Sequence, residues 1–172
     1  MGLRSAQLRL SPYDSRWKTL FREERDCLQA QIGQYVLDIQ HIGSTSIPGL
    51  PAKPILDIGI AVANFEEAVR CVTPLEKLEF MYKGENGIPR RHYFVKGNPR
   101  THHLHMLEIE SGAWRNHLLF RDFLIRNPET ASHYAQLKEE LVKQFSNDRE
   151  AYQAGKDSFI KAVLQRAGST WI

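Results

Sequence analysis

The hydrophobic and polar positions of this chain follow two periods, and each change of period predicts a change of element. From residue 15 to residue 33, apolar side chains recur every three or four positions, as on one face of a helix, and Gly33 is a typical stop. Residues 35–42 alternate instead, which is the period of a half-buried strand. The pattern therefore predicts a helix and then a strand that runs directly into Gly43-Ser44.

Residues 55–62 are almost continuously apolar and predict a strand inside a sheet, interrupted only by Asp57. After this strand, Asn64 and Glu67 resemble a capping box for a helix that is kinked or restarted at Pro74. A single acid in an otherwise apolar strand is unusual, so Asp57 becomes the first candidate for chemistry.

The remaining chain predicts more strands and then only helices. Three segments have strand character and are separated by glycine-rich turns: residues 80–83, 91–96 and 101–109. The short connection between the last two suggests an antiparallel hairpin. From Trp114 onward the period is helical, with breaks at residues 127–128 and 147–148, so three helices are expected, and their apolar faces are interpreted as core.

This order of elements predicts an α/β (α+β) fold with a mixed or antiparallel sheet flanked by helices and a C-terminal helical segment. We find no repeat and no long linker, which favours one domain over residues 1–172. About residues 1–110 would form the sheet-containing core, and about residues 112–172 a helical tail packed on it.

Composition narrows the function classes. The chain has 172 residues, is 42% hydrophobic and 25% charged, and carries a formal charge of +3. Acids and bases alternate in the helices, so no specific binding of nucleic acid is expected. Neither a signal peptide nor a CxxC spacing accompanies the two cysteines, which predicts a cytoplasmic protein. No apolar run approaches the roughly 20 residues needed to span a bilayer, so no membrane partner is expected.

Two features together suggest a phosphate and metal site. A strand that ends in Gly43-Ser44 brings backbone N–H groups and a hydroxyl close to a phosphate. Burying the carboxylate of Asp57 is costly unless it meets a metal, a cation or several donors. Lys53 is the competing explanation, because its ammonium group would keep Asp57 ionised in a purely structural pair.

The residues around these features resemble a known family. Residues 41–50, HIGSTSIPGL, followed by residues 52–58, AKPILDI, resemble the signature of the GrpB family. Further agreeing pieces are residues 12–14, 87–89, 93–97, 101–105 and 120–122, so the resemblance covers nearly the whole chain.

The GrpB family is similar in fold to the nucleotidyltransferases, which implies a nucleotidyltransferase-like sheet. In those enzymes a Gly-Ser turn precedes a strand with two acids at alternate positions, and the acids hold catalytic magnesium. Asp57 matches the first acid, but Gly59 stands at the second position. Two-metal chemistry needs more carboxylate ligands than this strand supplies.

A histidine-rich strand offers replacement ligands. Strand alternation puts His103 and His105 on one face, and His102 and Glu108 on the other. With Asp57, the first pair would form a two-histidine, one-carboxylate site for Zn²⁺, Mn²⁺ or Fe²⁺, or else bind phosphate or act as acid and base. His92, His117 and His133 are interpreted as surface or packing residues.

Among the cations near these segments, Lys53 and Arg91 are the preferred candidates for binding phosphate. Tyr93 shares a strand face with Arg91, where its ring would stack on a base or belong to the core.

The sequence thus predicts a nucleotidyltransferase-like protein for a nucleotide or another phosphorylated small molecule. The predicted phosphate-binding residues are Gly43, Ser44, Lys53 and Arg91, and the predicted catalytic and metal-binding residues are Asp57, His103 and His105. The metal would be Mg²⁺, or Zn²⁺, Mn²⁺ or Fe²⁺ if the histidines ligate. If active, the protein would transfer a nucleotidyl group to an unknown acceptor. The alternatives are a non-catalytic ligand-binding module and a mononuclear metal enzyme.

Overall fold

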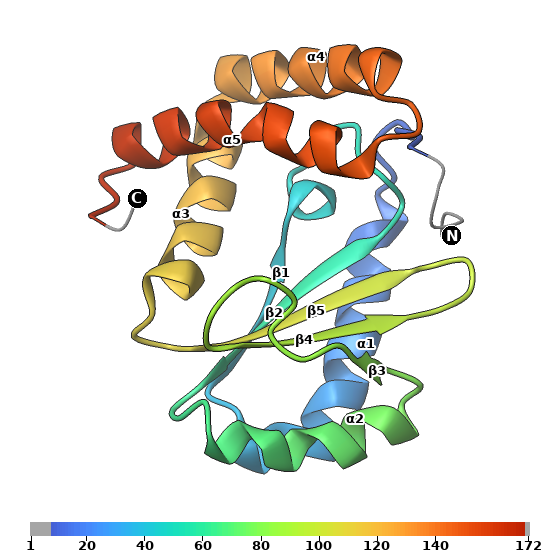
Figure 1. Cartoon of the computed structure of the whole chain (residues 1–172), viewed down its shortest axis with the longest axis vertical. Coiled ribbons are helices and arrows are strands. Elements are labelled where there is room, and N and C mark those ends of the chain that lie inside the picture. Colours follow the sequence, from blue (N-terminus) through green and yellow to red (C-terminus); the bar gives the residue numbers. More distant parts are fainter. Residues whose placement is uncertain (1–7, 171–172) are drawn as a thin grey trace.

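The computed structural model describes residues 8–170, and one mixed sheet lies at its centre (Figure 1). The strands within this range are β1 (Asp38–Ile42), β2 (Leu56–Val62), β3 (Met81–Tyr82), β4 (Arg91–Lys96) and β5 (His102–Glu108). Their spatial order is β1-β2-β5-β4-β3. Strand β2 is antiparallel to β1 and parallel to β5, while β4 is antiparallel to β5 and to β3. The predicted mixed sheet and the interior position of β2 are confirmed.

The predicted helices are also present. Among the described residues the α-helices are α1 (Arg16–Ile32), α2 (Val72–Lys77), α3 (Gly112–Arg126), α4 (Pro128–Gln144) and α5 (Arg149–Arg166). Pro128 begins α4, and Asp148 caps α5 by accepting a hydrogen bond from the Ala151 N–H at 2.9 Å. Asn127 precedes α4 without capping it through its side chain, whose amide donates to the Phe123 carbonyl at 2.8 Å instead.

The segment after β2 begins as predicted and then changes helix type. The Glu67 N–H donates to Asn64 Oδ1 at 3.0 Å, which starts a 3₁₀ segment, η3 (Glu67–Cys71). Regular α-helix restarts at Val72, two residues before Pro74. Proline is tolerated there because the first N–H groups of a helix have no partner inside it.

One face of the sheet is apolar and lies against α1 and α2. Phe21 and Leu28 of α1 and Leu75 of α2 share a buried cluster with Ile58 and Ile60 of β2. Because side chains alternate along a strand, the residues between these isoleucines face the opposite side. The core therefore directs Asp57 away from α1 and α2.

The opposite face of the sheet lies below the C-terminal helices. Trp114 of α3 packs on Ala61 of β2 and Leu107 of β5. A second cluster joins the loop after β1 to all three helices through Ile47, Leu50, Leu124, Tyr134 and Val163. Figure 1 shows α4 and α5 as a layer at the end of the molecule away from α2. Within residues 8–170, none of the helices combines the length and the apolar character needed to cross a bilayer.

Candidate functional site

Asp57 and two histidines form a compact cluster on the face of the sheet that lies below α3. The parallel register sets Asp57 of β2 opposite His103 of β5, and Gly59 opposite His105. His103 Nδ1 lies 2.9 Å from Asp57 Oδ1, and His105 Nε2 lies 3.6 Å from the same oxygen. His102 faces the other side, where its Nδ1 lies 2.8 Å from Thr101 Oγ1. The structure thus has the alternation that the sequence predicted.

The two histidines stabilise Asp57 as a carboxylate. Burial alone would raise the pKa of Asp57, but the hydrogen bond from His103 and the close approach of His105 outweigh burial and hold the pKa below its ordinary value. Burial in turn lowers the pKa of His105. Lys53, the alternative partner considered above, is not among the ion-pair partners of Asp57 in the described part of the chain. Its Nζ lies 4.0 Å from the centre of the Tyr152 ring.

The ligand atoms of Asp57, His103 and His105 lie within 4.8 Å of one another, so the cluster fits one metal ion. Two ligand atoms of a tetrahedral zinc ion lie roughly 3.4 Å apart, close to the distances found here. His103 Nε2 is buried and has no hydrogen-bond partner, which leaves this imidazole incompletely satisfied by the protein. The donor set of two imidazoles and one carboxylate suits Zn²⁺, Mn²⁺ or Fe²⁺ better than Mg²⁺.

Arg91 was predicted to bind phosphate, but the structure places it under the loop of residues 84–90. Its side chain is buried, and Nη2 donates to the carbonyls of Glu85 and Asn86 at 3.1 and 2.9 Å. Nη1 donates to His105 Nδ1 at 3.3 Å. A guanidinium group has no acceptor, so neutral His105 carries its hydrogen on Nε2 while this bond is kept. In that tautomer His105 supports Asp57 as a donor, and Asp57 and His103 remain available as ligands.

A side chain at Gly59 of β2, where a second carboxylate would stand, would be crowded by its neighbours. A Cβ atom at Gly59 would lie 3.0 Å from the Trp114 ring and 3.3 Å from the Ile42 side chain. These contacts are tighter than ordinary van der Waals packing. The packing of α3 on the sheet therefore accounts for a glycine at position 59, where the nucleotidyltransferase pattern has an acid. His105 lies opposite Gly59 on the neighbouring strand β5.

Gly43 brings the turn after β1 onto Asp57. Its φ of +69° favours glycine, and a Cβ atom there would lie 2.5 Å from Asp57 Oδ2. Ser44 follows and begins the short helix η2 (Ser44–Ser46). The Ser44 hydroxyl accepts a hydrogen bond from Lys138 Nζ at 3.2 Å. The predicted Gly-Ser turn thus lies beside the predicted acid.

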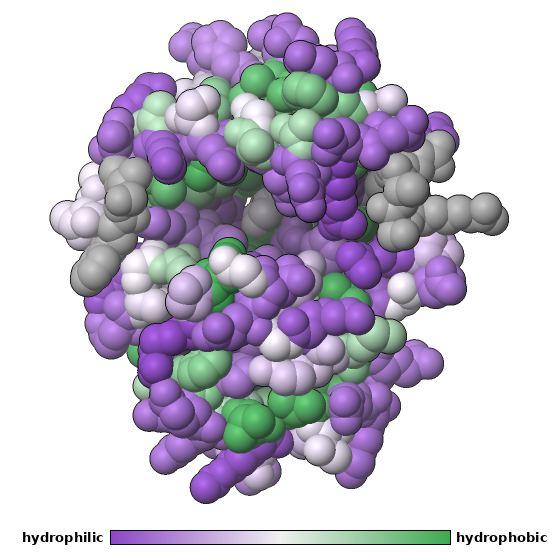
Figure 2. Space-filling view, in the orientation of Figure 1, coloured by the Kyte–Doolittle hydropathy of each residue, from purple (hydrophilic) through white to green (hydrophobic). Residues whose placement is uncertain are grey.

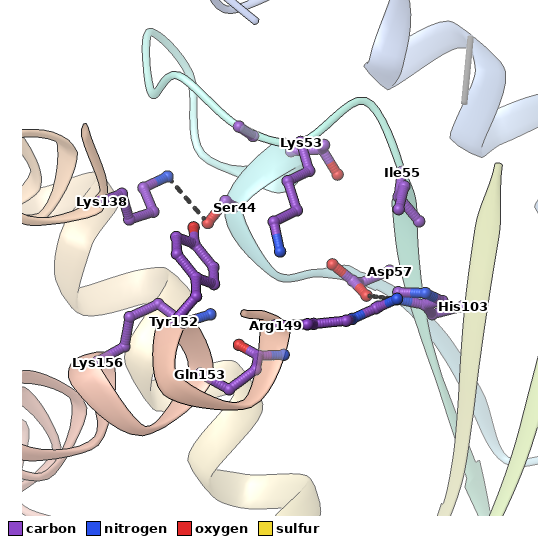
Figure 3. Close-up of a pocket in the computed structure, with 12 residues that line it drawn as sticks. Ser44, Lys53, Ile55, Asp57, His103, Lys138, Arg149, Tyr152, Gln153 and Lys156 are labelled. Atoms are coloured by element: carbon purple, nitrogen blue, oxygen red, sulfur yellow. Dashed lines mark hydrogen bonds and ion pairs between the residues drawn. The ribbon is translucent and has the colours of Figure 1, made fainter. Parts of the chain in front are cut away.

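A small cationic pocket of about 100 Å³ opens next to Asp57 (Figure 3). Ser44, Asp57 and His103 form one wall, and the charged residues that line the pocket are Lys53, Lys138, Arg149 and Lys156. Figure 3 shows Lys53 reaching in from the loop before β2 and Arg149 reaching from the start of α5 toward Asp57. Figure 2 shows a hollow between the helical layer and the sheet, with hydrophilic residues prominent along it.

Burial is the main cause of a lowered pKa at three of these cations. The pKa is about 7 for Lys53, about 7 for Lys138 and about 8 for Lys156. Repulsion from neighbouring cations adds to the effect, since Lys156 lowers the pKa of both Lys53 and Lys138. The pocket therefore holds more positive charge than the protein neutralises, as expected for a site that binds an anion.

The sequence reasoning missed the cations of α4 and α5, because both helix faces were interpreted as core. A signal for two of them was present. Lys138 comes four positions after Tyr134 and three before Leu141, and Lys156 comes four positions after Tyr152. Both lysines thus stand on the buried stripe of their helix, where a charge needs an explanation.

His117 was interpreted as a surface or packing residue, yet it lies beside the cluster. Its ring centre is 5.3 Å from that of His105, and it lines a cavity that also contains Asp57. Burial lowers the pKa of His117 to about 3. His92, by contrast, is a packing residue as predicted: it stacks on Phe65 and lies 2.7 Å from the Tyr82 hydroxyl.

Comparison with known proteins gives consistent matches over most of the chain. A family model described as GrpB protein matches residues 7–166. UPF0157 protein YqkA of Bacillus subtilis is 42% identical over 90% of this chain, which spans only 46% of YqkA. Glutamate-rich protein GrpB of Alkalihalophilus pseudofirmus is 31% identical over 95% of this chain and 98% of that protein. The crystal structure of conserved protein GrpB from Enterococcus faecalis has a TM-score of 0.86 and 34% identity, covering 92% of this chain and 96% of that chain.

Proposed function

This chain belongs to the GrpB family, and on that premise we propose that it binds a divalent metal at Asp57 together with the phosphate groups of a small molecule. The nucleotidyltransferase resemblance makes a nucleoside triphosphate the first candidate for that molecule, with nucleotidyl transfer to an acceptor as the reaction. The observation that carries the proposal is the cluster of Asp57, His103 and His105 at the wall of a pocket lined by four cations.

The phosphate part of the proposal rests on uncompensated charge. Lysine and arginine side chains are rarely buried without anionic partners. Here Lys53, Lys138, Arg149 and Lys156 line one small pocket in which Asp57 is the acidic residue. One carboxylate does not balance four cationic side chains, so most of the positive charge is left for a ligand to neutralise. A phosphate group supplies two negative charges and several acceptors in a volume that fits such a pocket.

The metal part rests on the donor set. Asp57 and His103 would hold the ion, and His105 would join them if it gave up the hydrogen bond from Arg91. When bound, a divalent ion would neutralise phosphate charge and polarise a phosphoryl oxygen. With Gly59 packed against Trp114, a second acid at this position of β2 would crowd its neighbours, which favours one ion over two.

The chain's own residues would hold and orient the phosphates. Lys53 and Lys156 would neutralise their oxygens, while the Ser44 hydroxyl adds a short polar contact from the turn. A histidine of the cluster would accept or donate a proton at the acceptor group. Such positioning is most of what phosphoryl-transfer sites do.

A non-catalytic binding module is the second candidate, and one observation favours it. The position of the second nucleotidyltransferase acid is a glycine packed tightly against Trp114 and Ile42, so a site of this kind, with one acid, would bind a nucleotide without transferring it. A mononuclear metal enzyme that uses the same two histidines is the third possibility, and because it also needs one bound metal ion, metal analysis alone does not separate it from the first.

Metal analysis and calorimetry test the proposal. Wild-type protein is expected to bind about one equivalent of Zn²⁺ or Mn²⁺, and to bind tripolyphosphate or a nucleoside triphosphate in its presence. Asp57→Asn should lose the metal, whereas Asp26→Asn, at an exposed position of α1, should behave as wild type. Equal metal binding by Asp57→Asn and wild type would rule out this site.

Turnover separates the candidates that share the site. Release of pyrophosphate from a nucleoside triphosphate, lost in Asp57→Asn, would support nucleotidyl transfer. Tight binding without any product would support the binding module instead.

A further inference from the structure

A second chamber adjoins the cationic pocket and differs from it in chemistry. It has a volume of about 390 Å³, within the roughly 300–1,000 Å³ of small-molecule sites. Its walls are mainly apolar and come largely from α3, α4, α5, the end of β1 and the loop before β4. Its apolar lining includes Phe120, Ile160, Leu164 and Ile88.

The two chambers share walls at the proposed metal site. Ser44, Asp57 and Lys156 line both of them. A molecule that extends past these three residues would place a charged end in the first chamber and an uncharged end in the second, with Asp57 between them. The first chamber, at about 100 Å³, is too small for more than the charged end.

The aromatic wall of the second chamber is held in place by its own packing. The Tyr134 ring is buried, is stacked on Phe159 at 5.1 Å and meets Phe120 edge-on at 5.3 Å. His117 and Asn116 add polar groups from α3 to this otherwise apolar lining. A rigid aromatic surface with a few polar groups suits a flat heterocycle better than a flexible chain, because stacking costs the ligand little entropy.

We propose that the ligand is an organic phosphate whose planar heterocycle, of nucleobase type, occupies the chamber between Phe120, His117 and Ile160. This inference rests on the proposed function, since the phosphate end of the same molecule occupies the cationic pocket. The apolar contacts bind the ring, and His117 is positioned to discriminate between heterocycles by a hydrogen bond at its edge.

The test compares a ligand that has the ring with one that lacks it. Calorimetry with metal-loaded protein is run with tripolyphosphate, ATP and UTP. Wild type should bind at least one nucleotide about tenfold more tightly than tripolyphosphate, because a well-fitting apolar group commonly changes affinity by about that factor. Ile160→Phe, which narrows the chamber, should bring nucleotide affinity down to that of tripolyphosphate and leave tripolyphosphate unchanged.

Two further variants keep the test decisive. Ile88→Ala removes one wall at a residue that is 40% exposed, so it serves even if Ile160→Phe does not fold. Ile125→Phe is the matched control, at an exposed position of α3 that lines a different groove. Two outcomes would overturn this inference while leaving the proposed function intact. Wild type would bind nucleotides and tripolyphosphate equally well, or both Ile160→Phe and Ile88→Ala would keep the wild-type preference for nucleotide over tripolyphosphate. If neither ligand binds, the proposed function fails with it.

Discussion

At the scale of single residues, Arg91 connects the loop of residues 84–90 to the proposed metal site. Its guanidinium group has only donors, so each of its bonds needs an acceptor from the protein. The structure uses Arg91 to tie the carbonyls of Glu85 and Asn86 to His105. Arg91 therefore affects metal binding by fixing which ring nitrogen of His105 carries the hydrogen.

Removing Arg91 should change metal binding through His105. In Arg91→Met, His105 Nε2 no longer has to keep its hydrogen and can ligate, and a nearby positive charge is lost. Affinity for Zn²⁺ or Mn²⁺ should rise by about tenfold, the lower end of effects seen for residues that orient metal ligands. Calorimetry measures the change, with circular dichroism to check the fold.

A double variant isolates this mechanism. In a His105→Ala background, Arg91→Met should give no gain in metal affinity, because the ring that it releases is missing. Weaker or unchanged metal binding in the single variant would contradict the tautomer argument.

Gly59 illustrates what one sequence can and cannot reveal about a site. Its departure from the two-acid pattern was visible, and so was the pairing of His103 with His105 on one strand face. The packing of Trp114 against Gly59 could not be seen in the sequence, because it depends on how α3 crosses the sheet. Alternation within a strand is local, whereas the contents of a neighbouring layer are tertiary.

At the scale of elements, the strands and helices were predictable because their periods are long and regular. The breaks before α4 and α5 were predicted correctly, since Pro128 and Asp148 act locally. The function of the helix faces was not predicted. A lysine stem packs well in an apolar stripe, so Lys138 and Lys156 did not disturb the helical pattern that was interpreted as core.

The cations of α5 should therefore contribute to anion binding. Arg149→Gln and Lys156→Gln should each weaken tripolyphosphate binding by about tenfold or more, because hydrogen bonds to charged groups contribute about 1.5–3 kcal/mol. Lys161→Gln, on an exposed part of the same helix, is the control for the loss of one charge. Titration calorimetry at constant ionic strength measures all three. Equal losses in the three variants would indicate only a general charge effect.

At the scale of the whole molecule, the site exists only where the sheet and the helical tail meet. Asp57 and the histidines come from β2 and β5, while Lys138 and Lys156 come from α4 and α5. The loop after β1 and the three C-terminal helices also share one apolar cluster. We propose that residues 1–172 unfold as one cooperative unit, so that fluorescence and circular dichroism give the same denaturation midpoint.

The same denaturation experiment tests the pocket lysines Lys53 and Lys138 through pH. Lys53 and Lys138 have a pKa of about 7 in the folded protein because of burial, against 10.5 for an ordinary lysine. Between about pH 7 and pH 9, the folded state loses these protons while the unfolded state keeps them, so the free energy of unfolding should rise with pH. Each fully deprotonated lysine contributes a slope of up to about 1.4 kcal/mol per pH unit. Below about pH 7 both states are protonated at these lysines, and this contribution to the slope disappears.

Lys138→Met should flatten this slope, since it removes one of the titrating groups while keeping a side chain of similar length. Tripolyphosphate should act in the opposite direction. It binds the charged lysines, so its stabilisation should be larger near pH 6.5 than near pH 8.5, where those charges are largely lost. Urea denaturation with and without the anion measures both effects. A flat wild-type profile, or the same slope in Lys138→Met, would mean that the pocket lysines keep their protons without a ligand.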